Sequence, residues 1–371
     1  MTIERNVTST DTEPELDALY ADLAAGELQP LWTITQELLT PTPRPKAIPW
    51  LWRASMMRPL AERAIRLVPV ERGGERRVLS LANPGLNGLP HAAGTLWGAL
   101  QCLGPRESAP AHRHSPGAIR FVMEGEGVWT TVNGDACDMH PGDLVLTPGW
   151  YWHDHTNAGD GNMFWFDGLD LPMIQALDAV FFEPHPEFQQ AVDGPHNKSE
   201  AAHPDDAAKF LPGQVDTALD PSPSPLLVYR WSDTSARLAR LRAETDEAMV
   251  SVEFTNPDSG ASVLPTLACA AHRLGAGATL PVRRTGNAVY VVFQGEGTSV
   301  IDGQRFEWRT GDMFVVPSWS AVEHHGTGDA DLFSISDTPV LRALGIHREQ
   351  HLDAPQRITG TFAGAAEGAR P

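Results

Sequence analysis

The spacing of hydrophobic residues changes near residue 92 and divides the chain into a helical beginning and a β-rich remainder. Before that point Leu16, Leu19 and Leu23 recur at helical spacing, and Gly26 can end the pattern. This spacing predicts a helix over 12–26, and a second helix is expected over about 58–67. The proline-rich residues 41–50 between them are expected to be extended.

After residue 92 the apolar segments become short. Residues 94–103, 118–134 and 143–157 alternate or are rich in β-branched and aromatic side chains, and Gly, Pro or Asn-Gly interrupts them. This pattern predicts antiparallel β-strands. Residues 183–226 are rich in Pro, Asp, His and Ser, which indicates a long surface connection with some short helix.

The β pattern occurs twice. Residues 118–150 match residues 288–319 at an offset of 170 residues that shortens to 169. The matching positions are Gly125 and Gly295, Gly142-Asp143 and Gly311-Asp312, and Pro148 and Pro317. An internal repeat of this length indicates two copies of one β domain.

Composition and charge exclude several classes of protein. The 371 residues are 42% hydrophobic and 20% charged, which is typical of a soluble globular protein. Apolar runs are too short to span a bilayer and no signal segment is visible, so we expect a cytoplasmic protein without a membrane partner. The net charge of −19 disfavours nucleic acid as a partner, and an anionic substrate would need a local arginine cluster. The three cysteines include no CxxC motif and are expected to be buried thiols.

Two histidines, His112 and His114, stand one residue apart just before the first copy of the repeat. Residues i and i+2 of a strand point to the same side. Burying two imidazoles side by side without partners costs free energy, and a shared metal ion removes that cost. Neutral imidazole is a ligand for Fe, Zn, Cu or Ni, so the pair predicts a metal site.

The order of His112, His114, Gly142-Asp143, Pro148 and His153 resembles the cupin signature. With the segments "HRHSPGAIRF" and "WYWHDHTN", nearly the whole chain resembles the gentisate 1,2-dioxygenase family, which includes salicylate and 1-hydroxy-2-naphthoate dioxygenases. The resemblance implies an all-β core of two cupin (jelly-roll) β-barrels after an N-terminal helical segment, and a homotetramer. The expected domains are 1–90 (helical and extended), 91–182 (catalytic cupin), 183–245 (connection), 246–345 (second cupin, without metal) and 346–371 (tail).

The resemblance also implies the metal ligands. His112, His114 and His153 would hold one Fe(II) per chain in the N-terminal cupin. Many cupins add a glutamate, but Ala118 stands at that place here, so three histidines leave the opposite side of the metal open. In the second copy the equivalent positions hold Val282, Arg284 and either Val322 or Glu323. We therefore expect no catalytic metal there.

The substrate residues follow from the same comparison. Arg120 is expected to point inward, by alternation from His114, and to bind a carboxylate. The family pattern places Arg72 and Arg76 in the substrate pocket, and Trp97 and Gln101 on its wall. His155 would contact substrate or oxygen, and Asp167 would orient His155 or Gln101. The small Ala99, also on the pocket wall, favours a small substrate.

These residues predict an extradiol-type Fe(II) dioxygenase. It would insert both atoms of O2 into gentisate (2,5-dihydroxybenzoate) between C1 and C2 to give maleylpyruvate. The alternatives are dioxygenases for salicylate, a substituted salicylate or 1-hydroxy-2-naphthoate. A non-catalytic metal-binding bicupin and a metal-dependent isomerase or decarboxylase are the other candidates.

Overall fold

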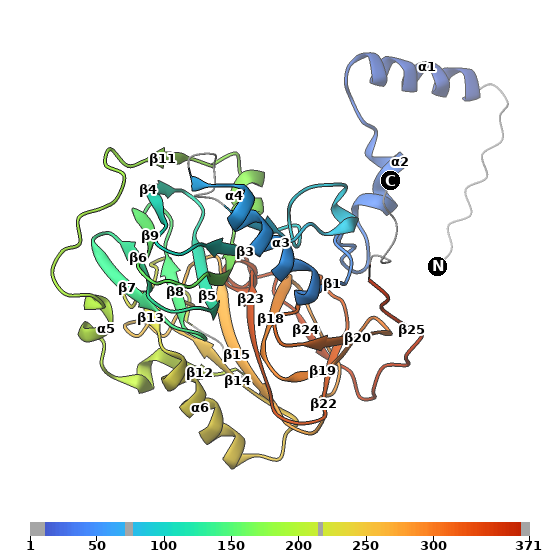
Figure 1. The fold of residues 1–371 in the computed structure, drawn as a ribbon. Helices are drawn as coiled ribbons and strands as arrows, with labels where there is room; N and C mark the ends of the chain where they lie inside the picture. Colours follow the sequence, from blue (N-terminus) through green and yellow to red (C-terminus); the bar gives the residue numbers. More distant parts are fainter. Residues whose placement is uncertain (1–11, 71–76, 214–217, 365–371) are drawn as a thin grey trace. The chain divides into compact units, whose positions relative to one another are not determined.

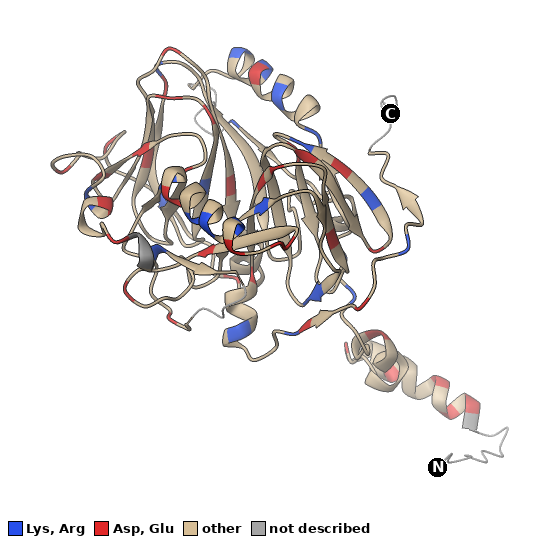
Figure 2. Cartoon of the chain, turned by 90° about the horizontal axis from the view of Figure 1, so that it is seen from below, with Lys and Arg blue, Asp and Glu red and all other residues tan. Residues whose placement is uncertain are grey.

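The computed structural model describes residues 12–70, 77–213 and 218–364, and these residues form two compact units that divide between residues 44 and 45 (Figure 1). In the first unit, α1 (Thr12–Ala25) confirms the helix predicted there, and Glu13 and Glu15 lie in its first turn. Carboxylates at this end of a helix interact favourably with its dipole. Figure 2 colours the described acidic residues of the chain red. A second helix, α2 (Leu31–Leu38), was not predicted. None of the described helices combines the length and the apolar character needed to cross a membrane.

The second unit holds two β-barrels, which confirms the predicted fold class. Among the described residues the first barrel pairs two sheets, in the orders β11-β4-β9-β6-β7 and β13-β8-β5-β10-β3-β2. Its strands are β2 (Val78–Ser80), β3 (Trp97–Leu103), β4 (Ser108–His114), β5 (Ala118–Glu124), β6 (Val128–Val132), β7 (Asp135–Met139), β8 (Leu144–Thr147), β9 (His153–Asn157), β10 (Met163–Leu169), β11 (Phe182–Pro184) and β13 (Val228–Tyr229).

The second barrel repeats this plan with the orders β1-β21-β18-β23-β15-β14-β12 and β24-β17-β22-β19-β20-β25, and β16 also pairs with β22. Its strands are β1 (Trp50–Trp52), β12 (Phe210–Pro212), β14 (Met249–Phe254), β15 (Ala268–Leu274), β16 (Gly277–Ala278), β17 (Val282–Arg284), β18 (Ala288–Gln294), β19 (Glu296–Ile301), β20 (Gln304–Arg309), β21 (Met313–Val316), β22 (Val322–Gly326), β23 (Ala330–Ser336), β24 (Glu349–His351) and β25 (Gly360–Thr361).

Matching two-residue turns give the strands of both barrels the same pairing register. Asn133-Gly134 joins β6 to β7, Asp302-Gly303 joins β19 to β20, and all four residues have positive φ. Two-residue turns of this kind match the twist of the strands that they connect. His153 lies opposite Val132 and Val322 lies opposite Ile301, so Val322 is the counterpart of His153. The choice between Val322 and Glu323 is thereby settled.

The segment that precedes each barrel contributes a strand to the other barrel and then forms a helix that packs on its own barrel. The strand β1, which precedes the first barrel in sequence, pairs with β21 of the second, and β13 pairs with β8 of the first. The helices that follow these strands are α3 (Ala54–Leu67) and α6 (Trp231–Glu244). Asp312 accepts a hydrogen bond from the Ala54 backbone N–H at 2.8 Å, and Asp143 accepts one from the Trp231 N–H at 2.9 Å.

This exchange explains two differences from prediction. The helix α3 begins four residues before the predicted residue 58, because its first N–H finds a carboxylate far away in sequence. The helix α6 was not predicted. Residues 183–226 contain the short elements α5 (Lys198–Ala202), η4 (Asp206–Lys209) and β12 within a long connection. The remaining short helices are η3 (Pro84–Leu86), α4 (Leu171–Ala176) and α7 (Thr338–Ala343).

One apolar cluster extends through both barrels, and a second cluster lies within the second barrel. The rings of Phe121 on β5 and Phe333 on β23 stack with centroids 4.2 Å apart and an interplanar angle of 6°. Two hydrogen bonds also join the barrels: Thr95 donates to Asp337 of the second barrel, and Thr266 donates to Asp170 of the first. Both aspartates are 2% exposed. Cys102, Cys137 and Cys269 are buried free thiols, as predicted.

Candidate metal centre and its cavity

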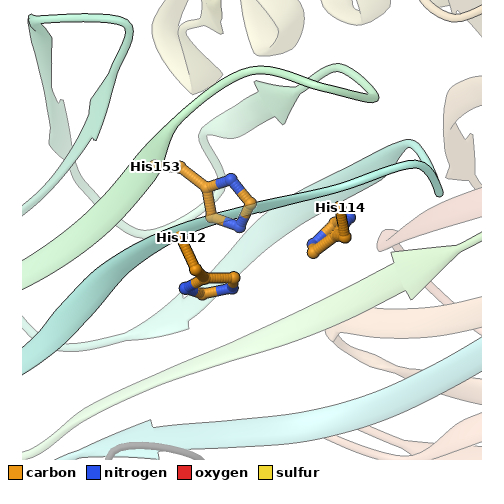
Figure 3. A group of neighbouring side chains, drawn as sticks. All are labelled: His112, His114 and His153. Carbon is orange, nitrogen blue, oxygen red and sulfur yellow. The ribbon is translucent and has the colours of Figure 1, made fainter. Parts of the chain in front are cut away.

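Neighbouring strands of the first barrel bring three histidines together. His112 and His114 lie at the end of β4, and the first residue of β9, His153, pairs with His112. The candidate ligand atoms all lie within 4.8 Å of one another (Figure 3). Ring centroids are 4.4 Å apart for His112 and His153, and 4.8 Å apart for His114 and His153.

Backbone carbonyls determine which nitrogen each ring presents. The Nδ1 atoms of His112, His114 and His153 lie 3.0, 2.7 and 3.0 Å from the carbonyl oxygens of Pro110, Pro116 and Tyr151. A carbonyl oxygen only accepts, so each Nδ1 carries the hydrogen and each Nε2 keeps a lone pair. This is the tautomer in which a histidine binds a metal through Nε2.

The burial of His153 supports the same conclusion. The residue is 1% exposed, and its buried Nε2 has no hydrogen-bond partner among the described residues. Burial, and then the positive charge of Arg120, hold the pKa of His153 well below its usual value. A neutral imidazole with an unused buried lone pair fits a metal ion. Within the described residues no fourth His, Cys, Asp or Glu joins this group, so the residues present fit an ion with open positions.

A cavity of about 350 Å³ adjoins the histidines. Its polar lining comes from both sheets, and its apolar lining includes an aromatic wall. The polar residues are Gln101, His112, His114, Arg120, His155 and Asp167, and the apolar ones include Val78, Trp97, Leu169, Val180, Phe181 and Phe182. Trp97 and Gln101 thus line the cavity together, whereas Ala99 between them is fully buried opposite Asp167 and is not among the described lining residues.

A buried ion pair lies in the cavity wall. Arg120 on β5 is 4% exposed, its Nε is 3.5 Å from Asp167 Oδ1, and its Nη1 donates to Thr147 Oγ1 at 2.6 Å. Asp167 also accepts a hydrogen bond from Trp165 Nε1 at 3.0 Å. Burial raises the pKa of Asp167 to about 6, against the opposing effect of Arg120. The guanidinium has donors left over, so it can bind an anion in the cavity.

The structure corrects two details of the prediction. Arg120 and His114 lie on different strands, β5 and β4, so alternation along one strand was the wrong reason for an inward Arg120. Asp167 faces Arg120 and Trp165, whereas His155 Nδ1 is hydrogen-bonded to Thr130 Oγ1 at 2.9 Å. Asp167 was expected to orient His155 or Gln101, and the partner that the geometry gives it is Arg120.

The arginines before the first barrel have different outcomes. Arg72 and Arg76 lie outside the described residues, so their expected place in the pocket stays a prediction. Arg77 donates to the carbonyl oxygens of Ile65 and Val68 at the end of α3 and pairs with Glu107. It therefore stabilises a helix end and is not part of the described cavity lining.

The aromatic wall of the cavity was not predicted from the sequence. Phe181 and Phe182 come from the segment after α4, and the ring of Phe182 stacks on that of His112 at 5.1 Å. Two adjacent phenylalanines before a polar, proline-containing stretch were the available signal. In the second barrel, the positions of His112 and His114 hold Val282 and Arg284, and Arg284 forms an ion pair with Glu349.

Comparisons with known proteins agree with this site. The cupin domain family matches residues 99–169. A gentisate 1,2-dioxygenase from Streptomyces sp is 46% identical over 92% of this chain and 98% of its own length. A 5-aminosalicylate 1,2-dioxygenase from Comamonas sp is 38% identical over 94% and 95%. The crystal structure of salicylate 1,2-dioxygenase from Pseudoaminobacter salicylatoxidans with gentisate has a TM-score of 0.85 and 40% identity, and the match covers 95% of this chain and 98% of that one. Fold, histidine cluster and similarity over nearly the whole length together show that this chain belongs to the gentisate 1,2-dioxygenase family of bicupin enzymes.

Proposed function

We propose that this chain is an Fe(II)-dependent, extradiol-type dioxygenase that cleaves gentisate between C1 and C2 with O2 to give maleylpyruvate. The observation that carries the proposal is the set of three Nε2 lone pairs, fixed by three backbone carbonyls, beside a cavity that contains Arg120. The similarity to dioxygenases that act on 2-hydroxybenzoates supports it.

His112, His114 and His153 would hold the iron, whose chemistry when bound is to accept the oxygens of an anionic chelating acid and to activate O2. Neutral imidazoles leave its positive charge uncompensated, which favours an acid as the substrate. The carboxylate of that acid would bind Arg120, which Thr147 and Asp167 hold in place. Charge-assisted hydrogen bonds of this kind fix orientation as well as affinity.

His155 would serve as a hydrogen-bonding or proton-transfer group beside the ring. Its Nδ1 is engaged by Thr130, so Nε2 is the atom available to a ligand in the cavity. Burial holds the pKa of His155 well below its usual value. A neutral imidazole is therefore present at neutral pH. A hydroxyl group on the substrate ring is the chemical partner that this nitrogen suits.

Oxygen uptake by the iron-loaded protein tests the proposal. Protein reconstituted anaerobically with Fe(II) is offered gentisate, salicylate, 5-aminosalicylate and 1-hydroxy-2-naphthoate. We expect one O2 consumed per gentisate, ring-cleaved product, and the highest kcat/KM for gentisate. A higher kcat/KM for another of these acids would transfer the proposal to that substrate. Iron-loaded protein that consumes no O2 with any of them would favour a non-catalytic metal-binding role.

The resemblance to the family also leads us to propose a cytoplasmic homotetramer in which the first cupin is catalytic. Light scattering coupled to size-exclusion chromatography measures the mass of the assembly. Iron analysis gives the metal content, which we expect to be one ion per chain. Two ions per chain would contradict a metal-free second barrel.

A further inference from the structure

A segment that we call the strap, residues 177–192, covers the strand that carries His112 and His114. Its strand β11 pairs with β4, with Phe182 opposite His114. Further along, the Ala111 N–H donates to the carbonyl of Phe188 at 2.7 Å. The strap supplies Val180, Phe181 and Phe182 to the cavity. One wall of the cavity therefore depends on the position of the strap.

Apolar burial contributes little to holding this segment. Phe181, Phe182 and Phe188 are 58%, 45% and 57% exposed. Hydrogen bonds must therefore supply much of the stabilisation of the strap.

Gln190 makes the densest set of these hydrogen bonds at the end of the strap. Its Nε2 donates to the Thr131 carbonyl and to Asp154 Oδ2, both at 3.0 Å. Its backbone N–H donates to the same Asp154 oxygen at 2.9 Å, and its Oε1 accepts from the Gly134 N–H at 3.2 Å. One side chain thus joins the strap to β9, to β6 and to the turn after β6.

The second barrel contains a glutamine with the equivalent hydrogen bonds. Gln356 Nε2 donates to the Val300 carbonyl at 2.8 Å, its backbone N–H donates to Glu323 at 2.9 Å, and its Oε1 accepts from the Gly303 N–H at 3.0 Å. Thr131 pairs with Asp154 in the first barrel, as Val300 pairs with Glu323 in the second. Gln356 is therefore the structural counterpart of Gln190, in a barrel whose sequence lacks the histidine triad.

We propose that Gln190 is a positioning residue for substrate binding: it fixes the strap over the metal-ligand strand and so keeps the aromatic wall of the cavity in place. The inference rests on the proposed dioxygenase function, because its ligand is the aromatic acid. Loss of the Gln190 bonds leaves the wall ordered in only a fraction of the molecules. Apparent affinity for the acid falls by that fraction, while the assembled site keeps its chemistry.

The test compares two matched substitutions in the full-length iron-loaded protein, Gln190→Met and Gln356→Met. Methionine has nearly the length of glutamine, and its side chain makes none of the strong side-chain hydrogen bonds, whereas the backbone N–H bond to Asp154 or Glu323 is kept. For Q190M we expect the KM for gentisate to rise by about tenfold with kcat within about twofold of wild type. For Q356M we expect both constants to stay within about twofold, although the loss of thermal stability is similar.

Hydrogen–deuterium exchange gives a readout that does not depend on turnover. Exchange should accelerate in residues 177–192 of Q190M, and in residues 349–361 of Q356M. Wild-type turnover tests the dioxygenase function separately, so its failure can be distinguished from a failure of this proposal. If Q190M is insoluble, Gln190→Ser removes the same bonds with less bulk. Equal changes of KM in the Q190 and Q356 variants, or an unchanged KM with a faster-exchanging strap, would overturn the assignment.

Discussion

The carbonyls of Pro110, Pro116 and Tyr151 decide which nitrogen each candidate ligand presents. Spacing and resemblance to a family were enough to predict the three histidines. Their tautomers could not be predicted, because these depend on local backbone geometry around each ring. Arg120 illustrates a different limit. Arg120 lines the pocket as predicted, but for a different reason: β5 belongs to the sheet opposite the one that contains β4. Residue alternation along the chain does not show that the chain passes from one sheet to the other between these strands.

Substitutions of two histidines on β9 test whether one of them binds the metal and the other acts on the substrate. His153 and His155 are both almost completely buried, but Nδ1 of the first bonds to a carbonyl and Nδ1 of the second bonds to Thr130. We expect H153A to lose at least about nine-tenths of its iron, since a facial set of three ligands loses one. We expect H155A to keep its iron and to lose about 10²–10⁴-fold in kcat. Metal analysis and oxygen uptake measure both effects, and iron loss in H155A equal to that in H153A would contradict the assignment of roles.

At the scale of elements, helices and strands that depend on local sequence patterns could be predicted. Those that depend on long-range contacts could not. The helix α1 and the strands β5, β8 and β9 follow from periodicity and from turn residues, and they were predicted close to their observed positions. The start of α3 and the whole of α6 were not, because each begins where a carboxylate from the opposite barrel meets its first N–H. The Gly-Asp pairs were recognised as a repeat, but a repeat alone does not say that its aspartate caps a distant helix.

Because of this capping, we expect equivalent substitutions of Asp143 and Asp312 to lower the free energy of unfolding by different amounts. Asp143 caps α6 and pairs with Arg230, whose side chain is 14% exposed, whereas Asp312 caps α3 and pairs with Arg53, whose side chain is 33% exposed. Removing either carboxylate leaves the helix N–H without its acceptor, and the more buried arginine is left without one of its partners. We expect D143A to lower the free energy of unfolding by about 3 kcal/mol and D312A by about 2 kcal/mol. Chemical denaturation of the two variants measures both losses, and a larger cost for D312A would contradict this account.

At the scale of the whole molecule, two copies of one fold have acquired different interiors while keeping the same connections. In the first copy Gln101, Arg120 and Asp167 face the cavity beside three histidines. In the second, β15 carries His272, which bonds to Ser251 and Ser334, and Tyr290 stands at the position of Arg120. The difference at the ligand positions could be predicted by counting along the repeat. The reciprocal contacts between barrels could not, since Thr95 and Thr266 precede the segments that were aligned.

These reciprocal contacts carry a prediction with a pH dependence. Thr266 donates to the Asp170 carboxylate, which also accepts the Gly117 N–H at 2.9 Å, whereas the Asp337 carboxylate keeps two bonds from Asn287 when the Thr95 hydroxyl is removed. We therefore expect T266V to lower the free energy of unfolding more than T95V does, by about 2 against about 1 kcal/mol at pH 8.

Burial raises the pKa of Asp170 to about 6, above the value of an exposed aspartate, so this carboxyl group is charged in the fold only above that pH. A donated hydrogen bond matters most to the charged form. The cost of T266V should therefore shrink as the pH falls from 8 to 5, because protonation removes the charge that Thr266 stabilises. Denaturation midpoints of both variants and wild type across this range measure the effect, and a cost of T266V that stays constant or grows toward pH 5 would contradict a charged Asp170 stabilised by Thr266.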